Sequence, residues 1–388
     1  MNKKINLSRP FLNIQEKKYL NQVISRGWLT NGPMTIKFEE RVKKIIGSKF
    51  AIAVNSCTNG IIATLKALGL KEGDEIITTP MTFVSVIHAL ELFKFKIKLV
   101  DINTENYSLD FNSLKKNIGK KTKCVLITHY GGIPVDTREI INFCKKKKIF
   151  VVEDAATAFG SKIGNKMVGS SKNSISIFSF YANKVITTGE GGIITLNNRL
   201  LASKIRTIIS CGINKDPWKR SFQKKIWHYD VDSFGYKFNF TDIQAAIGIA
   251  QLKKLKKIII ERRKIRKKYN NLLNPLIKEN IIKVFKPKAN TTFSEYIYAI
   301  LLNKKKINSN RDGLINFLRE NNVFTTVHYI PANYHNFYKK KFKKFKLPNS
   351  NYTFNNILSL PFHNHLKNSE IIKVSQLILN YFKKNEKK

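Results

Sequence analysis

Short apolar segments alternate with segments of helical periodicity over roughly residues 35–210 of this 388-residue chain. Several of them are hydrophobic at consecutive positions, which is typical of strands buried on both faces of a parallel sheet. Seven strands are expected: Phe50–Val54, Glu75–Thr79, Lys98–Ile102, Cys124–His129, Ile149–Glu153, Ile175–Phe180 and Gly192–Leu196. Since helical patterns such as Thr58–Leu68 and Asp136–Lys146 separate them, the sequence predicts a layered α/β domain.

A long helical pattern runs from Thr241 to about Leu273, and such a helix could link two domains. Later elements are expected at Ser294–Leu302 and Phe324–Ile330 (strands) and at Arg311–Asn321 and Asn368–Lys384 (helices). At about 150 residues per domain, the length allows two or three domains. We therefore expect a large domain over residues 1–254 and a smaller α+β domain over residues 255–388.

The composition is strongly basic, because 70 Lys and Arg residues against 26 Asp and Glu residues give a formal net charge of +44. Such an excess can indicate a nucleic-acid or anionic-membrane partner. It also fits an AT-rich coding bias, which we favour, since Lys outnumbers Arg and both Asn and Ile are abundant. We interpret the basic run Lys339–Lys346 as a solvated surface.

Cysteine usage and apolar runs narrow the class of protein further. Cys57, Cys124, Cys144 and Cys211 are scattered without a C-x-x-C pair, which argues against a disulfide framework and a thiolate metal site. The N-terminal residues lack the apolar segment of a signal peptide. No apolar run approaches the ~20 residues that span a bilayer. We expect a cytoplasmic protein with no metal, membrane or nucleic-acid partner.

Three motifs lie where such a sheet would place a ligand. The segment Asn55–Gly60 follows a strand and opens a helix, whose N–H groups can hold a phosphate, although a Ser or Thr at this place is usually an ordinary N-cap. The segment Val151–Ala156 ends an apolar strand in two carboxylates, one of which can pair with a cationic ligand or cap a helix. Lys184 is isolated from other lysines before the Gly-rich turn Thr187–Gly192. A desolvated lysine there can form a Schiff base, and an ordinary lysine is the alternative.

Together these motifs resemble the DegT/StrS-type sugar aminotransferases, which are pyridoxal 5'-phosphate (PLP) enzymes. The resemblance runs nearly from end to end. It includes Arg26–Pro33, Phe38-Glu39, Asn55–Thr58, Gly73–Ile77, Thr82–Val84, His129–Gly132, Glu153–Ala156, Phe178–Phe180, Thr188–Gly192, Gly235–Asn239, Thr241–Ala246, Gln251-Leu252, His328-Tyr329 and Leu358–Pro361. It implies the PLP-dependent transferase fold type I, with a central, mostly parallel seven-stranded sheet flanked by helices and a smaller C-terminal α+β domain.

The resemblance also implies roles around the cofactor ring. Lys184 would form the Schiff base with PLP and then move the proton between Cα of the amino donor and C4′ of the cofactor. Asp154 would pair with the pyridine nitrogen and keep it protonated. Phe83 would stack on the ring. Thr157 stands where the family usually has Gln or His, which contacts the cofactor hydroxyl, and its shorter side chain has less reach.

Other residues would hold the phosphate and the substrate. Cys57, through its backbone N–H, Thr58 and Ser179 would hold the phosphate. Lys237 would reach the phosphate of the other subunit, which implies a homodimer with shared active sites. Expected substrate-binding residues are Thr30, Tyr181, His328 and Asn333. Asn333 replaces a usual His near the sugar, and His328 is equally explained as a packed strand residue.

The implied reaction moves an amino group from an L-amino acid, expected to be glutamate, to a nucleotide-linked 4-keto sugar. A UDP-linked sugar is favoured over a GDP- or dTDP-linked one, and the product would feed lipopolysaccharide, O-antigen or other surface polysaccharides. One alternative is a PLP-dependent sugar dehydratase, which Lys184 disfavours because those enzymes have His there. The other is a non-catalytic basic nucleic-acid-binding or regulatory protein on the same fold, which only the charge supports.

Overall fold

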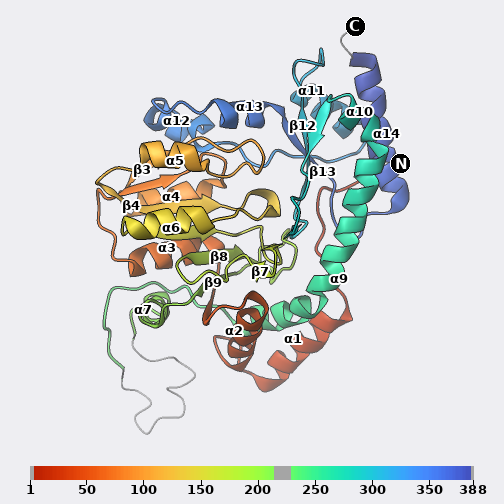
Figure 1. Ribbon diagram of the computed structural model, residues 1–388. Coiled ribbons are helices and arrows are strands. Elements are labelled where there is room, and N and C mark those ends of the chain that lie inside the picture. The colour runs from red at the N-terminus through yellow and green to blue at the C-terminus, as the bar shows by residue number, and fades with distance from the viewer. Residues whose placement is uncertain (1–3, 214–228, 386–388) are drawn as a thin grey trace.

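The computed structural model describes residues 4–213 and 229–385, and a seven-stranded sheet forms its centre (Figure 1). The strand order is β1-β9-β8-β5-β4-β2-β3. The strands are β1 (Phe50–Val54), β2 (Glu75–Thr78), β3 (Lys96–Leu99), β4 (Thr122–Thr128), β5 (Phe150–Asp154), β8 (Ile175–Ser179) and β9 (Gly192–Leu196). Only β9 runs antiparallel to its neighbours, β1 and β8. The expected α/β fold with a mostly parallel sheet is therefore confirmed.

All seven expected strands are present, and the third begins two residues and ends three residues earlier than expected. β3 ends at Leu99, and Ile102 instead forms an isolated bridge with Leu109. The side chain of Asp101 accepts hydrogen bonds from the amides of Asn349 and Ser350 at the start of α13 (Pro348–Asn356). The chain therefore leaves the sheet after β3, where Asp101 accepts hydrogen bonds from the first turn of α13 instead of pairing in the sheet.

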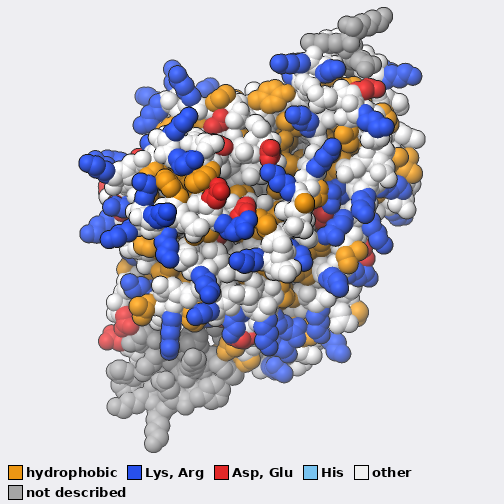
Figure 2. All heavy atoms as spheres, viewed as in Figure 1, with side chains coloured by type: hydrophobic (Ala, Val, Ile, Leu, Met, Phe, Trp, Pro, Cys, Tyr) orange, Lys and Arg blue, Asp and Glu red, His pale blue; other side chains and the backbone are white. Residues whose placement is uncertain are grey.

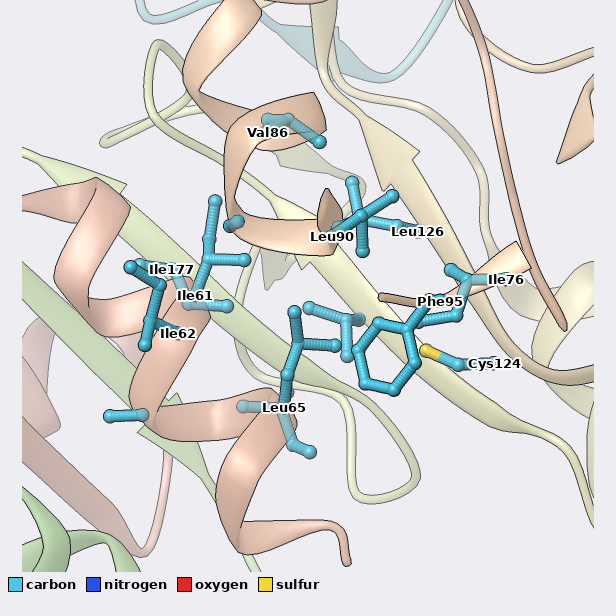
Figure 3. Packing of buried hydrophobic residues seen from close by; sticks show 14 of the residues in the cluster. Ile61, Ile62, Leu65, Ile76, Val86, Leu90, Phe95, Cys124, Leu126 and Ile177 are labelled. Carbon is cyan, nitrogen blue, oxygen red and sulfur yellow. The ribbon is translucent and has the colours of Figure 1, made fainter. Parts of the chain in front are cut away.

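Apolar residues at consecutive positions of β4 serve opposite faces of the sheet. Leu126 packs with α3 (Cys57–Ala67), α4 (Val84–Leu92) and α7 (Arg199–Ile209), a cluster that Figure 3 shows in part. Val125 and Ile127 pack instead with α5 (Phe111–Asn117) and α6 (Arg138–Lys146). Because side chains alternate along a strand, covering both faces requires a continuous apolar run.

The helix α9 (Asp242–Leu272) links the large sheet to the C-terminal elements (Figure 1). Its N-cap Thr241 forms a capping box with Gln244. Its first part packs against α1 (Ile14–Arg26) and α2 (Pro33–Ile46), and its last part enters a separate apolar cluster. The proposed boundary between residues 254 and 255 lies inside this helix. The two proposed domains also include residues 1–3, 214–228 and 386–388, which lie outside the described residues.

The C-terminal elements surround a small antiparallel sheet of β10 (Ile282–Val284), β12 (Tyr298–Leu302) and β13 (Ile357–Leu360). The further elements of the described chain are η1 (Tyr130–Gly132), β6 (Lys162–Ile163), β7 (Lys166–Met167), α10 (Asn274–Lys278), β11 (Thr291–Thr292), α11 (Arg311–Glu320), η2 (Ala332–Tyr334), α12 (Asn336–Phe342) and α14 (Asn368–Asn385). Within the described ranges, no helix is both long and apolar enough to cross a bilayer.

Two strand predictions in this region need correction. The segment Phe324–Ile330 is not a strand, because only Thr326 pairs with Ser359 and the next residues turn toward the large sheet, where Tyr130 donates a hydrogen bond to the carbonyl of His328. The strand expected from Ser294 begins only at Tyr298. Glu295 has a φ of 60°, which is outside the strand region.

Candidate active site

The candidate site lies where three segments meet at one edge of the sheet. Ser179 ends β8 and pairs with Gly192, which in turn pairs with Val54 at the end of β1. The start of α3 follows β1, so it lies beside the end of β8. Asp154 ends β5, which is parallel to β8, and therefore reaches the same edge. This is the edge at which open α/β sheets bind ligands.

Gly192 allows the start of α3 to approach the sheet closely. A Cβ at this position would lie 2.7 Å from the amide nitrogen of Cys57, closer than real Cβ contacts. Ser56 is the N-cap of α3 and accepts a hydrogen bond from the amide of Asn59 at 3.1 Å. The amides of Cys57 and Thr58 occupy the first turn, where helical N–H groups lack acceptors within the helix. Such a turn has the donors and the dipole that an anion requires.

The thiol of Cys57 remains protonated and faces the protein. Burial raises the pKa of Cys57 well above its usual range, and the nearby Asp154 carboxylate raises it further against the opposing effect of Lys184. The sulfur lies 3.9 Å from the carbonyl oxygen of Ile177, to which the thiol can donate. The chemistry of this residue at the site is therefore that of its backbone N–H.

Asp154 is a buried carboxylate with few partners. It accepts hydrogen bonds from the hydroxyl of Thr82 at 3.2 Å and from the amide of Ala156 at 3.1 Å. Burial raises its pKa, while the Ala156 amide, the Lys184 ammonium and the Thr82 hydroxyl act in the opposite direction. A cationic ligand group beside this carboxylate would offset its desolvation, so the residue fits a pyridinium N–H.

Lys184 lies half-buried in the loop between β8 and β9, and its ammonium acts on several site residues. Its charge opposes the rise in the pKa of Asp154 and of Cys57 that burial causes, and it adds to the fall in the pKa of His328. Its Nζ atom lies over the ring of Tyr296, 4.7 Å from the centroid. A lysine amine, a buried carboxylate and a helix N-terminus match the aldehyde, pyridine nitrogen and phosphate of PLP.

Two expected substrate residues come from the C-terminal part of the chain. Burial, together with the Lys184 ammonium, lowers the pKa of His328 to about 4, and its Nδ1 atom lies 2.9 Å from the hydroxyl of Ser359. His328 is thus a neutral, packed residue that also lies near Lys184. Asn333 donates to Asn351 at 3.3 Å, and its buried Oδ1 atom has no partner among the described residues.

The hydroxyl of Thr157 is engaged by the backbone. It donates to the carbonyl of His129 at 2.8 Å and accepts from the amide of Gly132 at 3.0 Å. A hydroxyl has one donor hydrogen, so only acceptor capacity remains for a ligand. The expected contact with the cofactor hydroxyl would therefore require that hydroxyl to donate to Thr157.

The remaining expected residues lie at the surface or at the rim of the site. Phe83 is 58% exposed, with its ring centroid 6.0 Å from that of Tyr329, and Tyr181 is 47% exposed. Thr30 and Lys237 are also exposed. The described chain thus brings Asp154, Cys57 and Lys184 together, while these four side chains face outward.

Sequence reasoning missed two contributors to the site. Nε2 of His129 lies 2.7 Å from the carboxylate of Glu153, and Nδ1 accepts the amide of Val135, which holds the ring beside the end of β5. Tyr296 lies under Lys184, although nothing in the sequence links the two positions. The first pair was detectable in principle, since both residues belong to motifs at strand ends.

A large groove of the described chain lies away from the expected site residues. Its volume is about 1390 Å³, and its lining includes residues 133–142, the β6–β7 hairpin and residues 288–291. It includes His129 and Glu153 but none of the expected site residues. Among the described residues, no cluster of three His, Cys, Asp or Glu side chains could hold a metal ion.

Comparisons with known proteins identify relatives of the whole chain. The chain is 36% identical over 386 residues to the uncharacterized protein MJ1066 of Methanocaldococcus jannaschii, with 97% of each chain covered. It is 32% identical to the spore coat polysaccharide biosynthesis protein SpsC of Bacillus subtilis, over 97% of this chain and 96% of that one. The structure of PseC from Helicobacter pylori, an aminotransferase involved in the biosynthesis of pseudoaminic acid, matches with a TM-score of 0.89 and 26% identity over 98% of this chain and 100% of that one.

The model of the DegT/DnrJ/EryC1/StrS aminotransferase family matches residues 11–379. This range includes every residue of the candidate site. The chain therefore belongs to the DegT/DnrJ/EryC1/StrS aminotransferase family and is a PLP-dependent aminotransferase.

Proposed function

We propose that the protein transfers an amino group from an L-amino acid, glutamate in the first instance, to a nucleotide-linked 4-keto sugar. The product would serve the biosynthesis of a surface polysaccharide or lipopolysaccharide. The observation that supports this proposal most directly is that Lys184 follows β8 at the sheet edge where Asp154 ends β5 and where α3 begins after β1. It is the arrangement that amino transfer through PLP requires.

PLP, when bound, supplies an aldehyde that takes up the amino group and a ring that accepts electrons from the donor's Cα. Lys184 would bind the aldehyde carbon and would hold and move the proton at Cα. Asp154 would keep the pyridine nitrogen protonated. The amides of Cys57 and Thr58, with Ser179, would hold the phosphate, and Phe83 would cover one face of the ring. Thr157 would accept a hydrogen bond from the ring hydroxyl.

The basic surface of the protein and the names of two relatives support a sugar nucleotide as the substrate. Lys and Arg side chains spread over the face of the molecule seen in Figure 2, with few acidic side chains between them. A cationic surface concentrates a diphosphate-linked substrate near the site. SpsC and PseC are named for the biosynthesis of a polysaccharide and of a sugar acid, which supports a sugar acceptor here. Thr30, Tyr181, His328 and Asn333 would contact the substrate.

A panel of acceptors tests the substrate. The purified protein is mixed with PLP, glutamate and, separately, UDP-, dTDP- and GDP-linked 4-keto sugars, and both 2-oxoglutarate and the amino sugar are measured. We expect both products, with the UDP-linked sugar preferred. If no acceptor yields 2-oxoglutarate, transfer from glutamate to these sugars is refuted. A deoxygenated sugar without the amino product would indicate a dehydratase instead.

Lys184→Ala tests the central residue. The variant should lose the visible absorbance of lysine-bound PLP, and borohydride should no longer attach the cofactor to the chain. Lys166→Ala, at an exposed position of β7, is the matched control and should behave as the wild type. Retention of covalent PLP in the Lys184 variant would contradict the assignment.

The site is proposed to be shared between two copies of the chain. Phe83 and Tyr181, which would lie beside the cofactor, are 58% and 47% exposed, and Leu29, before α2, and Ile36, in its first turn, are 48% and 42% exposed. A second copy over this region would bury them and bring its Lys237 to the phosphate. Exposed apolar patches of this kind mark protein interfaces.

Subunit mixing tests the shared site. Lys184→Ala and Lys237→Ala are each expected to be weak or inactive alone. Refolding the two together forms heterodimers in which one of the two sites contains both lysines. About one quarter of the wild-type sites is then restored, because half of the dimers are mixed. If mixing restores no activity while both proteins sediment as dimers, Lys237 does not act across the interface.

A further inference from the structure

We propose that Tyr296 is a positioning residue for Lys184, whose ammonium it holds against its ring face whenever Nζ is not bonded to the cofactor. This inference rests on the proposed function of Lys184. Neither the motifs nor the expected roles include Tyr296, which comes from the C-terminal part of the chain.

The contact has the geometry of a cation–π interaction. Nζ of Lys184 lies 4.7 Å from the ring centroid of Tyr296, and Tyr296 is only 5% exposed. An ammonium within about 6 Å of an aromatic face is attracted by the ring quadrupole, and more strongly where water is excluded. The half-buried lysine therefore has a favourable resting place inside the site.

The ring of Tyr296 is held in place by the site itself. Its hydroxyl lies 3.5 Å from Oδ1 of Asn183, the residue directly before Lys184. Its ring edge meets the ring of His328, with 5.8 Å between the centroids. Its hydroxyl also interacts with that of Tyr329. Contacts on several sides keep the ring under the lysine.

The backbone on either side of Tyr296 is anchored as well. The carboxylate of Glu295 pairs with Arg266, with 2.8 Å between Oε2 and Nε. The buried guanidinium of Arg262 donates to the carbonyl of Glu295 at 3.2 Å and to that of Tyr296 at 3.4 Å. Both arginines lie on α9, which connects to the large sheet. The ring is therefore fixed relative to the strands that carry Lys184.

Amino transfer requires that the amine of Lys184 stays in the site while it is not bonded to the cofactor. Lys184 must leave the aldehyde carbon when the amino acid binds there, and must stay close enough to move the proton at Cα. A free lysine side chain has several rotatable bonds, and ordering it carries an entropy cost. Attraction to a fixed ring keeps the amine in the site and favours its protonated form.

Capture of PLP by the cofactor-free protein tests the proposal without measuring turnover. The rate of covalent capture, followed by absorbance, rises with pH because only the neutral amine reacts. Removing the ring in Tyr296→Leu removes a contact that favours the ammonium, so the midpoint of this profile should move to lower pH by about 0.4–1.5 units. Tyr296→Phe keeps the ring and should keep the wild-type midpoint.

A structural role alone would slow capture or lower stability without moving the midpoint. Tyr107→Leu, at a buried tyrosine that packs with Tyr130 and Phe285, controls for such losses and should leave the midpoint unchanged. If Tyr296→Leu does not fold, Tyr296→Met provides the same comparison. An unchanged midpoint in a folded ring-free variant overturns the role of Tyr296. Absence of capture at Lys184 in the wild type would instead refute the proposed function.

Discussion

Asp154 depends on a ligand to complete its surroundings. Within the described chain it has two hydrogen-bond donors, Thr82 and Ala156, and burial raises its pKa. A pyridinium N–H opposite the carboxylate would reverse this effect, since an adjacent positive charge favours the ionised form. The ionised form of Asp154 is therefore disfavoured by burial in the absence of the cofactor and favoured when the pyridinium is bound.

The Asp154→Asn variant should therefore fold, bind PLP and transfer amino groups slowly. An amide cannot hold the ring nitrogen protonated, so the ring accepts electrons less readily. We expect kcat to fall at least about a hundredfold, or about 2.7 kcal/mol in barrier height. Steady-state kinetics measure this. Asp136→Asn, at a carboxylate paired with Arg138 at the surface, is the control. A loss smaller than about tenfold would contradict the role.

His363 should make the protein sensitive to mild acid. It is buried, and this burial lowers its pKa from 6.5 to about 4, although its Nε2 donates to the carbonyl of Asn6. Between these values the unfolded chain binds a proton that the folded chain does not. Stability is therefore unaffected above pH 6.5 and falls as the pH drops toward 4, by roughly 3 kcal/mol in total.

The measurement is urea unfolding of the wild type and His363→Gln between pH 7.5 and 4.5. The glutamine can still donate to Asn6 but does not titrate in this range. The wild type should lose more stability than the variant as the pH falls, by roughly 2 kcal/mol at pH 5. His88→Gln, at an exposed position, should follow the wild-type curve. Parallel curves for the wild type and His363→Gln would refute the prediction.

Single residues were predictable where the chain itself carries the pattern. Lys184 and Asp154 each end or follow an apolar strand, so sequence reasoning could place both at one edge of the sheet. Tyr296 could not be found in this way, because its approach to Lys184 depends on how the C-terminal part packs. The engagement of the Thr157 hydroxyl by His129 and Gly132 is equally a tertiary contact.

At the scale of elements, strands buried on both faces were the most predictable. The run in β4 is apolar throughout because Leu126 and its neighbours face different helix layers. The expected strand Phe324–Ile330 has a similar β-forming composition, but only Thr326 finds a ladder partner. The composition of a segment indicates that it can form a strand. Whether it pairs depends on a neighbouring strand, which the local sequence does not specify.

The start of α2 depends on a residue far away in sequence. Its N-cap Gly32 provides no side-chain acceptor, and Asp242 at the start of α9 accepts the amides of Met34 and Thr35 at 3.0 and 2.8 Å. The hydroxyl of Thr35 donates to the same carboxylate at 2.8 Å. One buried side chain thus joins two helix starts.

Asp242→Ala should consequently be strongly destabilising. It leaves buried donors of α2 without an acceptor, and hydrogen bonds to a charged group contribute about 1.5–3 kcal/mol each. We expect a loss of about 3 kcal/mol or more in urea unfolding. Asn198→Ala, which removes the cap of α7 from the amide of Leu201 at an exposed site, should lose only about 1 kcal/mol. Equal losses would show that Asp242 acts as an ordinary cap.

The positive charge is distributed over the whole molecule and is not confined to the candidate site. Even if each of the 26 acidic residues paired with a different cation, 44 of the 70 Lys and Arg residues would remain. They spread over the visible surface in Figure 2, whereas Lys184 lies half-buried in the site. Mutual repulsion among the surface charges opposes the compact state, and the same field attracts an anionic substrate.

Added salt should therefore act on stability and on substrate binding in opposite directions. Raising NaCl from about 20 to 300 mM shortens the screening length to below about 10 Å, which weakens repulsion among exposed lysines. We expect the unfolding temperature to rise by about 2–4 °C. The KM for the nucleotide sugar should rise over the same range, because screening also weakens the attraction of its phosphates.

KCl at equal ionic strength should reproduce both curves, since screening does not depend on the identity of the monovalent cation. A falling unfolding temperature would show that ion pairs such as Lys254–Glu16 outweigh the repulsion, and a constant KM would show that the surface charge does not contribute to substrate capture.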